Sequence, residues 1–213
     1  MKKILVFAFL AFGFTAFSQN DAKAEKLLNE VSAKIKSYKN ISLDFKYELS
    51  NLSENIKQET RGDVVIEGEK YKLNILGITR IYDGKTLYTI SPEDEEVTIS
   101  SNNTENENTI TPSDMLSFYE DGYTYKMDIV QNVKGRKIQY VKLSPIDANS
   151  EIKYVLLGID ATTKHIYNLI EAGNNGTKTT LTVNSFKTNE PISKTLFTFD
   201  ESKYSDYFIN KID

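Results

Sequence analysis

The sequence predicts a mainly β fold of the α+β class. One large curved antiparallel sheet is expected to form an incomplete β-barrel, capped by an N-terminal amphipathic helix and a short lid helix. Three observations lead to this prediction. About a dozen short segments have strand-like alternation or composition and are separated by turn residues. Two helical segments are inserted among them. Strands and helices do not alternate along the chain, which excludes a doubly wound parallel sheet.

The first eighteen residues have the pattern of a signal peptide. Lys2 and Lys3 precede an apolar run over residues 4–14, and small residues lead to Ser18. That run of about eleven residues is shorter than the roughly twenty that a membrane-spanning helix needs. We therefore expect cleavage after Ser18 and export to the periplasm, which leaves residues 19–213 as one soluble domain.

Composition excludes several classes of protein. The chain has 26 basic and 30 acidic residues, a formal charge of −4, and loss of the two leader lysines gives −6 (24 minus 30). This charge argues against nucleic-acid binding. Because the chain has no cysteine, it has no disulfide framework, no thiolate nucleophile, no cysteine-based metal site and no thiol for a lipid anchor.

The N-terminal part predicts one helix followed by strands. Apolar residues three, four or seven apart over residues 21–39 form one stripe of an amphipathic helix, which Asn40 can end. Residues 41–50 then alternate apolar and polar side chains, which predicts a strand with one buried face. Asp83-Gly84 predicts a type I′ hairpin turn. Further strands are predicted at residues 58–66, 71–76, 79–82, 86–90 and 96–100.

A polar loop and a second helix interrupt the strands. Residues 100–109, SSNNTENENT, cannot bury enough apolar surface to fold and predict a solvated loop. A short helix is predicted after this loop. Its N-cap is Thr111, Pro112 takes the first helical position, Asp114 takes the capping-box position and Gly122 ends it. Strands are predicted again at residues 123–133, 137–143, 152–159, 165–171, 177–188 and 194–199.

Some of the later strands are apolar on both faces. Residues 154–157 and 166–170 lack the clean alternation of a sheet that faces water. A second layer must therefore cover them, and the two helices are the obvious cover. The concave space that is left would be apolar, which is the sequence-level indication of an apolar ligand.

The residues that usually carry catalysis are scarce. The one histidine, His165, has no histidine or cysteine partners for a metal site, and its expected role is that of a partly exposed residue at a strand start. The acidic run over residues 93–96 reads as a solvated turn, and Gly173 to Gly176 lacks the helix and lysine of a phosphate-binding loop. We expect no enzyme activity, no cofactor and no metal.

The order of these parts resembles the LolA and LolB superfamily, over residues 22–200. The resemblance is carried by an ordered set of segments, of which the Asp-Gly-Lys-Thr-Leu-aromatic hairpin is the most specific. These segments are ISLDF (41–45), GDVVI (62–66), YDGKTLY (82–88) and TPSDML (111–116).

The resemblance implies both a fold and a function. The family fold is an incomplete antiparallel barrel whose hydrophobic cavity is closed by helices. The implied function is that of a monomeric periplasmic chaperone, which receives acylated lipoproteins from an inner-membrane ABC transporter and passes them to an outer-membrane acceptor. Two alternatives stay open: a binding protein of the same fold for another amphiphile, such as a glycolipid or lipid-linked precursor, and a periplasmic sensor or scaffold.

The candidate lipid-binding residues are apolar and aromatic side chains of the predicted strands and of the lid helix. Each could equally serve only in packing. They are Leu43, Phe45, Tyr47, Tyr71, Leu73, Met115, Leu116, Phe118, Tyr119, Tyr123 and Tyr125.

The sequence departs from the family at the lid latch. Well-studied members carry a Lys-Arg-Pro stretch after the second strand, whose arginine bonds to the helices and holds the lid shut. Here that region reads Glu67-Gly68-Glu69-Lys70. Either Lys70 replaces the arginine as a weaker latch or this latch is absent. Arg61 and Arg80 are two other guanidinium groups that could contact the lid.

Overall fold

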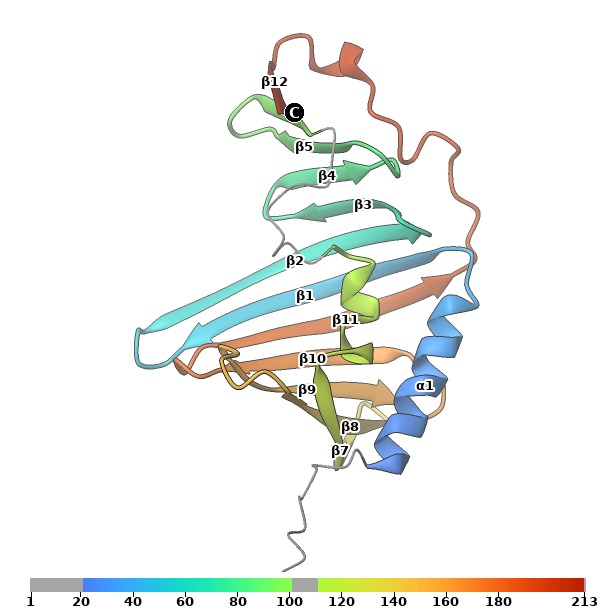
Figure 1. The fold of residues 1–213 in the computed structure, drawn as a ribbon. Coiled ribbons are helices and arrows are strands. Elements are labelled where there is room, and N and C mark those ends of the chain that lie inside the picture. The colour runs from blue at the N-terminus through green and yellow to red at the C-terminus, as the bar shows by residue number, and fades with distance from the viewer. Residues whose placement is uncertain (1–20, 101–110, 213) are drawn as a thin grey trace, which may run out of the picture.

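A computed structural model of the chain describes residues 21–100 and 111–212. It confirms the predicted fold class: one curved sheet of twelve strands wraps around a helix and a short lid segment (Figure 1). The strand order is β12-β6-β5-β4-β3-β2-β1-β11-β10-β9-β8-β7, and the edge strands β12 and β7 do not pair with each other, so the barrel is incomplete. The predicted signal peptide and nearly all of the predicted polar loop lie outside the described residues.

The elements follow the predicted order closely. Their bounds are α1 Ala22–Lys36, β1 Ile41–Asn51, β2 Ile56–Glu67, β3 Lys70–Ile75, β4 Ile78–Tyr82, β5 Leu87–Ser91, β6 Glu96–Ser100, η1 Asp114–Leu116, η2 Phe118–Glu120, β7 Tyr123–Val133, β8 Arg136–Pro145, β9 Ile152–Asp160, β10 Ile166–Gly173, β11 Lys178–Thr188, η3 Glu201–Tyr204 and β12 Phe208–Ile212. Within the described ranges, no helix has the length and apolar character that crossing a membrane requires.

Helix α1 lies inside the curve of the sheet, across the strands at one end (Figure 1). Its predicted apolar stripe is buried at Ala24, Leu28 and Val31. Asp21 caps the helix by accepting a hydrogen bond from the Lys23 amide, and its own amide donates to the carbonyl of Tyr125 on β7. The helix is therefore fixed at its first turn to the edge of the sheet.

The apolar core consists of two clusters on opposite faces of the sheet. The first lies on the concave side, where α1 and the lid pack against the central strands. The second lies on β4, β5 and β6 and contains Ile81, Ile90 and Val97, covered by Phe197. Ile81 follows Arg80 along β4, so it points to the face opposite Arg80. The β4–β6 half of the sheet thus has apolar packing on its convex side as well, while Tyr82 on β4 and Leu87 on β5 belong to the concave cluster.

Two expectations for the C-terminal part are wrong. Residues 194–199 were expected to be a strand, but they form turns without ladder pairing, because Phe197 packs onto the convex face of the sheet. The last strand, β12, was not predicted. It pairs in parallel with β6 and so breaks the otherwise antiparallel pattern.

Two local expectations also need correction. The Asp83-Gly84 hairpin exists, but its loop spans residues 83–86 and only Gly84 has a positive φ, of 97°. The Asp83 carboxylate accepts from the amides of Lys85 and Thr86, which makes an Asx turn in place of a type I′ turn. The expected lid helix consists of two short 3₁₀ turns, η1 and η2.

Candidate functional site: an apolar cavity beneath the lid

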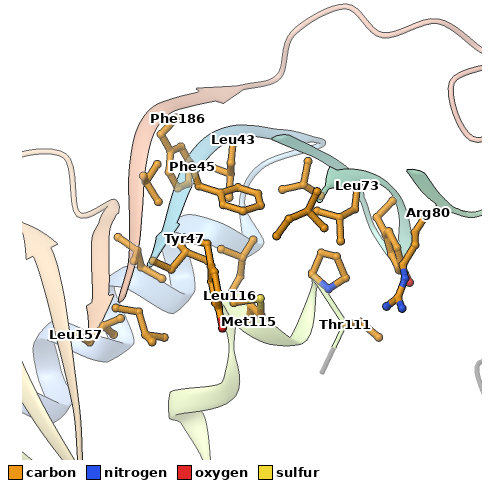
Figure 2. A pocket seen from close by; sticks show the side chains of 18 residues that line it. Leu43, Phe45, Tyr47, Leu73, Arg80, Thr111, Met115, Leu116, Leu157 and Phe186 are labelled. Carbon is orange, nitrogen blue, oxygen red and sulfur yellow. The ribbon is translucent and has the colours of Figure 1, made fainter. Parts of the chain in front are cut away.

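A cavity of about 200 Å³ lies between the concave face of the sheet and the first lid turn (Figure 2). Its walls come from the central strands β1 to β4 and β9 to β11, and its cover comes from residues 111–116. The lining residues are Leu43, Phe45, Tyr47, Val64, Tyr71, Leu73, Ile75, Arg80, Thr111, Pro112, Met115, Leu116, Leu157, Ile166, Leu169, Leu181, Val183 and Phe186.

Strand β1 supplies the middle of the wall. Because side chains alternate across a strand, Leu43, Phe45 and Tyr47 all point to the concave side. The Phe45 ring lies over Gly62, its cross-strand neighbour on β2, where an added Cβ would come within 2.6 Å of the ring. The glycine at position 62 therefore lets an aromatic ring lie flat against the strand.

Strands β9, β10 and β11 complete the wall on the other side of β1. In register, Tyr47 faces Leu181, Leu181 faces Leu169 and Leu169 faces Leu157, which makes one apolar row across four strands. The sequence indicated that β9 and β10 need cover on both faces. It did not identify their side chains as lining residues, because strand apolarity alone does not show which face is concave.

The lid segment, residues 111–120, covers the cavity with its first turn. Thr111 and Asp114 exchange hydrogen bonds as a capping box does: the Asp114 carboxylate accepts from the amide and hydroxyl of Thr111, and the Asp114 amide donates back to the Thr111 hydroxyl. This turn places Met115 and Leu116 over the cavity. Met115 is 37% exposed, so it borders both the cavity and solvent.

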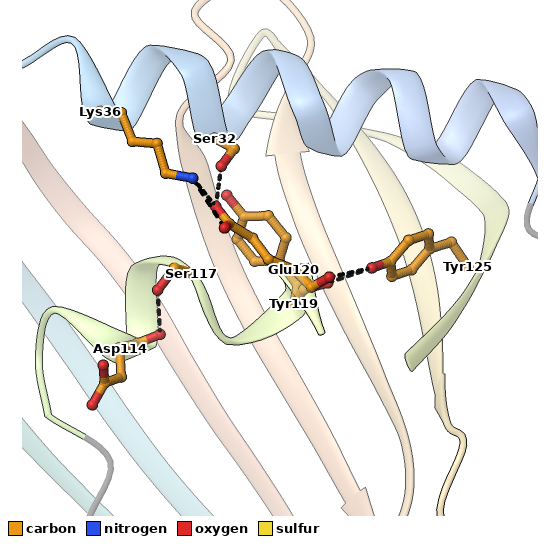
Figure 3. Close-up of polar contacts among 7 residues, drawn as sticks. All are labelled: Ser32, Lys36, Asp114, Ser117, Tyr119, Glu120 and Tyr125. Carbon is orange, nitrogen blue, oxygen red and sulfur yellow. Dashed lines mark hydrogen bonds and ion pairs between the residues drawn. The ribbon is translucent and has the colours of Figure 1, made fainter. Parts of the chain in front are cut away.

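The end of the lid is fastened to α1 (Figure 3). Glu120 accepts a hydrogen bond from the Ser32 hydroxyl and forms an ion pair with Lys36, whose Nζ lies 2.9 Å from Oε1. The Ser32 hydrogen bond, followed by the Lys36 contact, lowers the pKa of Glu120. The Tyr125 hydroxyl donates to the carbonyls of Tyr119 and Glu120, at 2.8 and 3.1 Å. The start of the lid has one polar contact with the sheet turn, from the Ser113 hydroxyl to the carbonyl of Gly68 at 3.3 Å.

The predicted lipid-binding residues divide into two groups. Those that line the cavity are Leu43, Phe45, Tyr47, Tyr71, Leu73, Met115 and Leu116. Phe118, Tyr119, Tyr123 and Tyr125 lie outside the lining: the first two belong to the second lid turn and the other two to the start of β7. There the Phe118 ring contacts the edges of Tyr119 and Tyr123, and Tyr119 is almost fully buried. These four residues position the lid.

Lys70, the latch residue that the resemblance suggested, has the β4–β5 loop as its neighbour. Lys70 is exposed at the start of β3, and its side chain runs alongside Gly84 in the β4–β5 loop. Within the described residues, no ion pair joins Lys70 to the lid segment. The ion pair that does hold the lid, between Lys36 and Glu120, was not predicted, because its two residues are 84 positions apart.

The site has little of the chemistry that catalysis uses. In the part of the chain that the structure describes, no group of three histidine or carboxylate side chains could hold a metal ion. His165 lies between α1 and β11, with Nε2 2.8 Å from the Tyr38 hydroxyl and its ring stacked on Phe186. The arrangement is an apolar cavity with a cover, which can enclose an apolar group.

Comparison with known proteins identifies the family. A sequence model for the family described as outer membrane lipoprotein carrier protein LolA matches residues 36–200, which are 165 of the 213 residues. No curated protein sequence matched the chain.

Solved structures share the fold at low sequence identity. An uncharacterized conserved protein from Thermus thermophilus superimposes with a TM-score of 0.60 at 9% identity, covering 89% of this chain and 99% of that one. LprF from Mycobacterium bovis gives 0.54 at 12% identity, covering 82% and 97%. MucB gives 0.52 at 14% identity, covering 84% of this chain and 64% of MucB.

Proposed function

Because this chain belongs to the LolA family of outer membrane lipoprotein carriers, we propose that it binds the acyl chains of lipoproteins beneath the lid and carries them through the periplasm. The observation that carries the proposal is the apolar cavity between the concave sheet and residues 111–116. Soluble proteins seldom leave such a surface open, and the lid covers it when no cargo is bound.

The size of the cavity implies that the lid moves. Its volume of about 200 Å³ is smaller than the roughly 300–1,000 Å³ of typical small-molecule pockets. A whole acyl chain therefore does not fit under the closed lid. Met115 and Leu116 must move away from the sheet to admit one, and the polar contacts of Glu120 oppose that movement.

Release without an energy source limits how much of the cargo is buried. Full burial of a sixteen-carbon chain would contribute about 12 kcal/mol at roughly 0.8 kcal/mol per methylene, before ordering costs. A carrier that buried three such chains completely would not release them. Partial burial, together with lid closure that favours the empty state, keeps the affinity low enough for transfer.

The partners follow from the family. We propose that the inner-membrane lipoprotein-releasing ABC transporter supplies the cargo and that an acceptor in the outer membrane receives it. Neither step needs an enzyme activity or a cofactor in this chain.

Transfer of an acylated lipoprotein from membranes into solution tests the proposal. Residues 19–213 would be incubated with inner-membrane vesicles that hold a labelled triacylated lipoprotein and the transporter, and soluble complexes would be counted after the membranes are sedimented. Met115→Glu should abolish uptake at nearly unchanged stability, because Met115 borders solvent. Ile129→Glu is the matched control, since Ile129 is 54% exposed on β7 and outside the cavity lining.

Two outcomes would overturn the carrier function. One is failure of the unaltered protein to take up lipoprotein, combined with recovery from the periplasm without any bound amphiphile as judged by mass spectrometry. The other is equal uptake by Met115→Glu and the unaltered protein, which would place the cargo elsewhere.

A further inference from the structure

Along one row of side chains, the concave face changes from apolar to polar where the cavity ends. One row of side chains crosses the sheet in register, and every member points to the concave side because each faces its neighbour across a ladder. Along β1, β2, β3, β4, β5, β6 and β12 this row reads Leu43, Val64, Leu73, Arg80, Thr89, Thr98 and Asn210. The first three are apolar and the last four are polar. We call Arg80, Thr89, Thr98 and Asn210 the polar shelf.

Arg80 stands at the boundary. It is the one charged residue among the described residues that line the cavity. Figure 2 shows it at the end of the cavity away from Leu157, beside Thr111 at the start of the lid. A ligand that filled the cavity with its apolar part would bring the adjoining atoms to this guanidinium group.

The rest of the polar shelf supplies groups for hydrogen bonding. All four side chains are half-buried. At its far end the Glu96 carboxylate accepts from the Thr98 hydroxyl at 3.2 Å and from the Asn210 amide at 3.4 Å. Glu96 on β6 thus binds the two shelf residues farthest from the cavity, and Arg80 is the shelf residue that lines the cavity.

This half of the sheet has an apolar cluster on the other face, and on the concave face the next row of side chains, Tyr82 and Leu87, is apolar. Ile81, Ile90 and Val97 alternate with shelf residues and are buried under the C-terminal segment on the convex side. The strands that carry the polar shelf thus pack an apolar cluster on their convex face. A polar row of side chains next to an apolar cavity matches the two parts of an amphiphile, its head group and its acyl chain.

We propose that Arg80 and the polar shelf form a head-group subsite, which binds the phosphate or carboxylate group of an anionic amphiphile whose acyl chain lies in the cavity. A planar guanidinium donates two parallel hydrogen bonds to either group, and such charge-assisted bonds are stronger than neutral ones. The subsite rests on the proposed function in requiring an acyl chain in the cavity. It adds a preference for anionic cargo, which a neutral diacylglyceryl group would not satisfy.

Single-chain probes of equal length test this preference. Binding of hexadecanoate, hexadecyl phosphate and hexadecanol to residues 19–213 would be measured by displacement of a fluorescent fatty-acid probe at pH 8, below the probes' micelle concentrations. Both anions should bind roughly tenfold more tightly than the alcohol, the size expected for a hydrogen bond to a charged group. The two anions separate carboxylate from phosphate as the preferred source of charge.

Matched variants assign the preference to Arg80. Arg80→Gln should remove the advantage of the anions over hexadecanol, while Arg80→Lys should retain part of that advantage. Arg61→Gln is the control, because Arg61 is exposed on β2 and points to the opposite face from Gly62 and the cavity. It changes the net charge by the same amount and should leave all three affinities as they are.

The outcomes separate this inference from the carrier function. If the alcohol binds as tightly as the anions, or if Arg80→Gln weakens all three probes equally, the head-group subsite is wrong while the carrier function stands. If neither the probes nor a triacylated lipopeptide bind, both are wrong. An anion advantage that disappears equally in Arg61→Gln would show a long-range charge effect and would also overturn the subsite.

Discussion

Lys36 and Glu120 join helix α1 to the lid: Nζ in the last turn of α1 lies 2.9 Å from Oε1 at the end of the lid. Ser32, one turn earlier on α1, donates a hydrogen bond to the same carboxylate. The lid of this chain is thus fastened from the helix. The β2–β3 turn, where the family resemblance suggested a latch, contributes the Gly68 carbonyl, which accepts a hydrogen bond from the Ser113 hydroxyl.

Removing the Glu120 charge should loosen the lid without unfolding the domain. Exposed ion pairs contribute about 1 kcal/mol or less, and the Lys36 and Glu120 side chains are 65% and 34% exposed. For Glu120→Gln we therefore expect a loss of at most about 1 kcal/mol in the free energy of unfolding. Backbone amides of residues 111–120 should exchange several-fold faster with deuterium, because local opening is less opposed.

Lys203→Gln is the control for this variant. It removes a comparable exposed ion pair, with Asp200, in the C-terminal segment. Exchange in the lid should stay at the level of the unaltered protein. Unchanged lid exchange in Glu120→Gln would show that the other contacts, such as the Tyr125 hydrogen bonds and the ring contacts of Phe118, are enough to hold the lid.

His165 should make stability fall at mildly acidic pH. Burial between α1 and the sheet lowers the pKa of His165, the positive charge of Lys34 lowers it further, and Asp160 opposes them. The neutral ring is thus favoured in the folded state. The contribution of neutral His165 to the free energy of unfolding is fully present above about pH 6.5, the pKa of histidine in the unfolded chain. It is lost as the pH falls through the lower pKa of His165 in the folded protein. Urea denaturation at a series of pH values from 8 to 5 measures this.

The chain offers a clean control, because His165 is its only histidine. His165→Phe keeps a ring to stack on Phe186, whose centroid is 4.0 Å from that of His165. The decline in stability just below pH 6.5 should disappear in this variant. An equal decline in both proteins would assign the effect to carboxylates.

The central part of the fold was predictable because each element has a strong local signal. The alternation of residues 41–50 and the helical stripe of residues 21–39 are both borne out by β1 and α1. The cavity residues of β1 could be named because the strand has one apolar face. Arg80 could not be placed beside them, since its position depends on the register of four strands.

The C-terminal part and the lid were harder to predict for a different reason. Phe197 and its neighbours are apolar like a strand, but they pack side-on against the convex face of strands about a hundred positions earlier in the chain. Likewise the Thr111–Asp114 capping box is present, yet Glu120 must reach α1, and two 3₁₀ turns achieve this. Tertiary contacts override the local pattern in both cases.

Phe197→Ala should destabilise the β4–β6 half of the sheet. Phe197 is 7% exposed and covers Ile81, Ile90 and Val97, so its truncation leaves a cavity in a small cluster. The expected loss is about 3–5 kcal/mol. Amides of β4 to β6 should lose protection from exchange before those of β1 and β11. Phe208→Ala is the control, since Phe208 is 67% exposed, and its effect should stay within about 0.5 kcal/mol. A similar loss in both variants would contradict the covering role of Phe197.

Gly62→Ala tests whether the cavity depends on the ring that lies over this glycine. An added Cβ would lie 2.6 Å from Cζ of Phe45 and 2.7 Å from the carbonyl oxygen of Asn74, both too close. The carbonyl belongs to the sheet and cannot move far, so the Phe45 ring must shift toward the cavity that it lines. Overpacking of this kind costs about 1–3 kcal/mol of stability.

The same shift should reduce binding, because the ring would occupy space that an acyl chain needs. Hexadecanol should therefore bind more weakly to Gly62→Ala than to the unaltered protein, while Gln58→Ala, at an exposed position of the same strand, should match the unaltered protein. Adding Phe45→Leu to Gly62→Ala should restore part of the binding by removing the displaced ring. Stability would return only partly, because the Asn74 carbonyl still meets the new Cβ. Full stability of Gly62→Ala alone would mean that the ring has another position open to it.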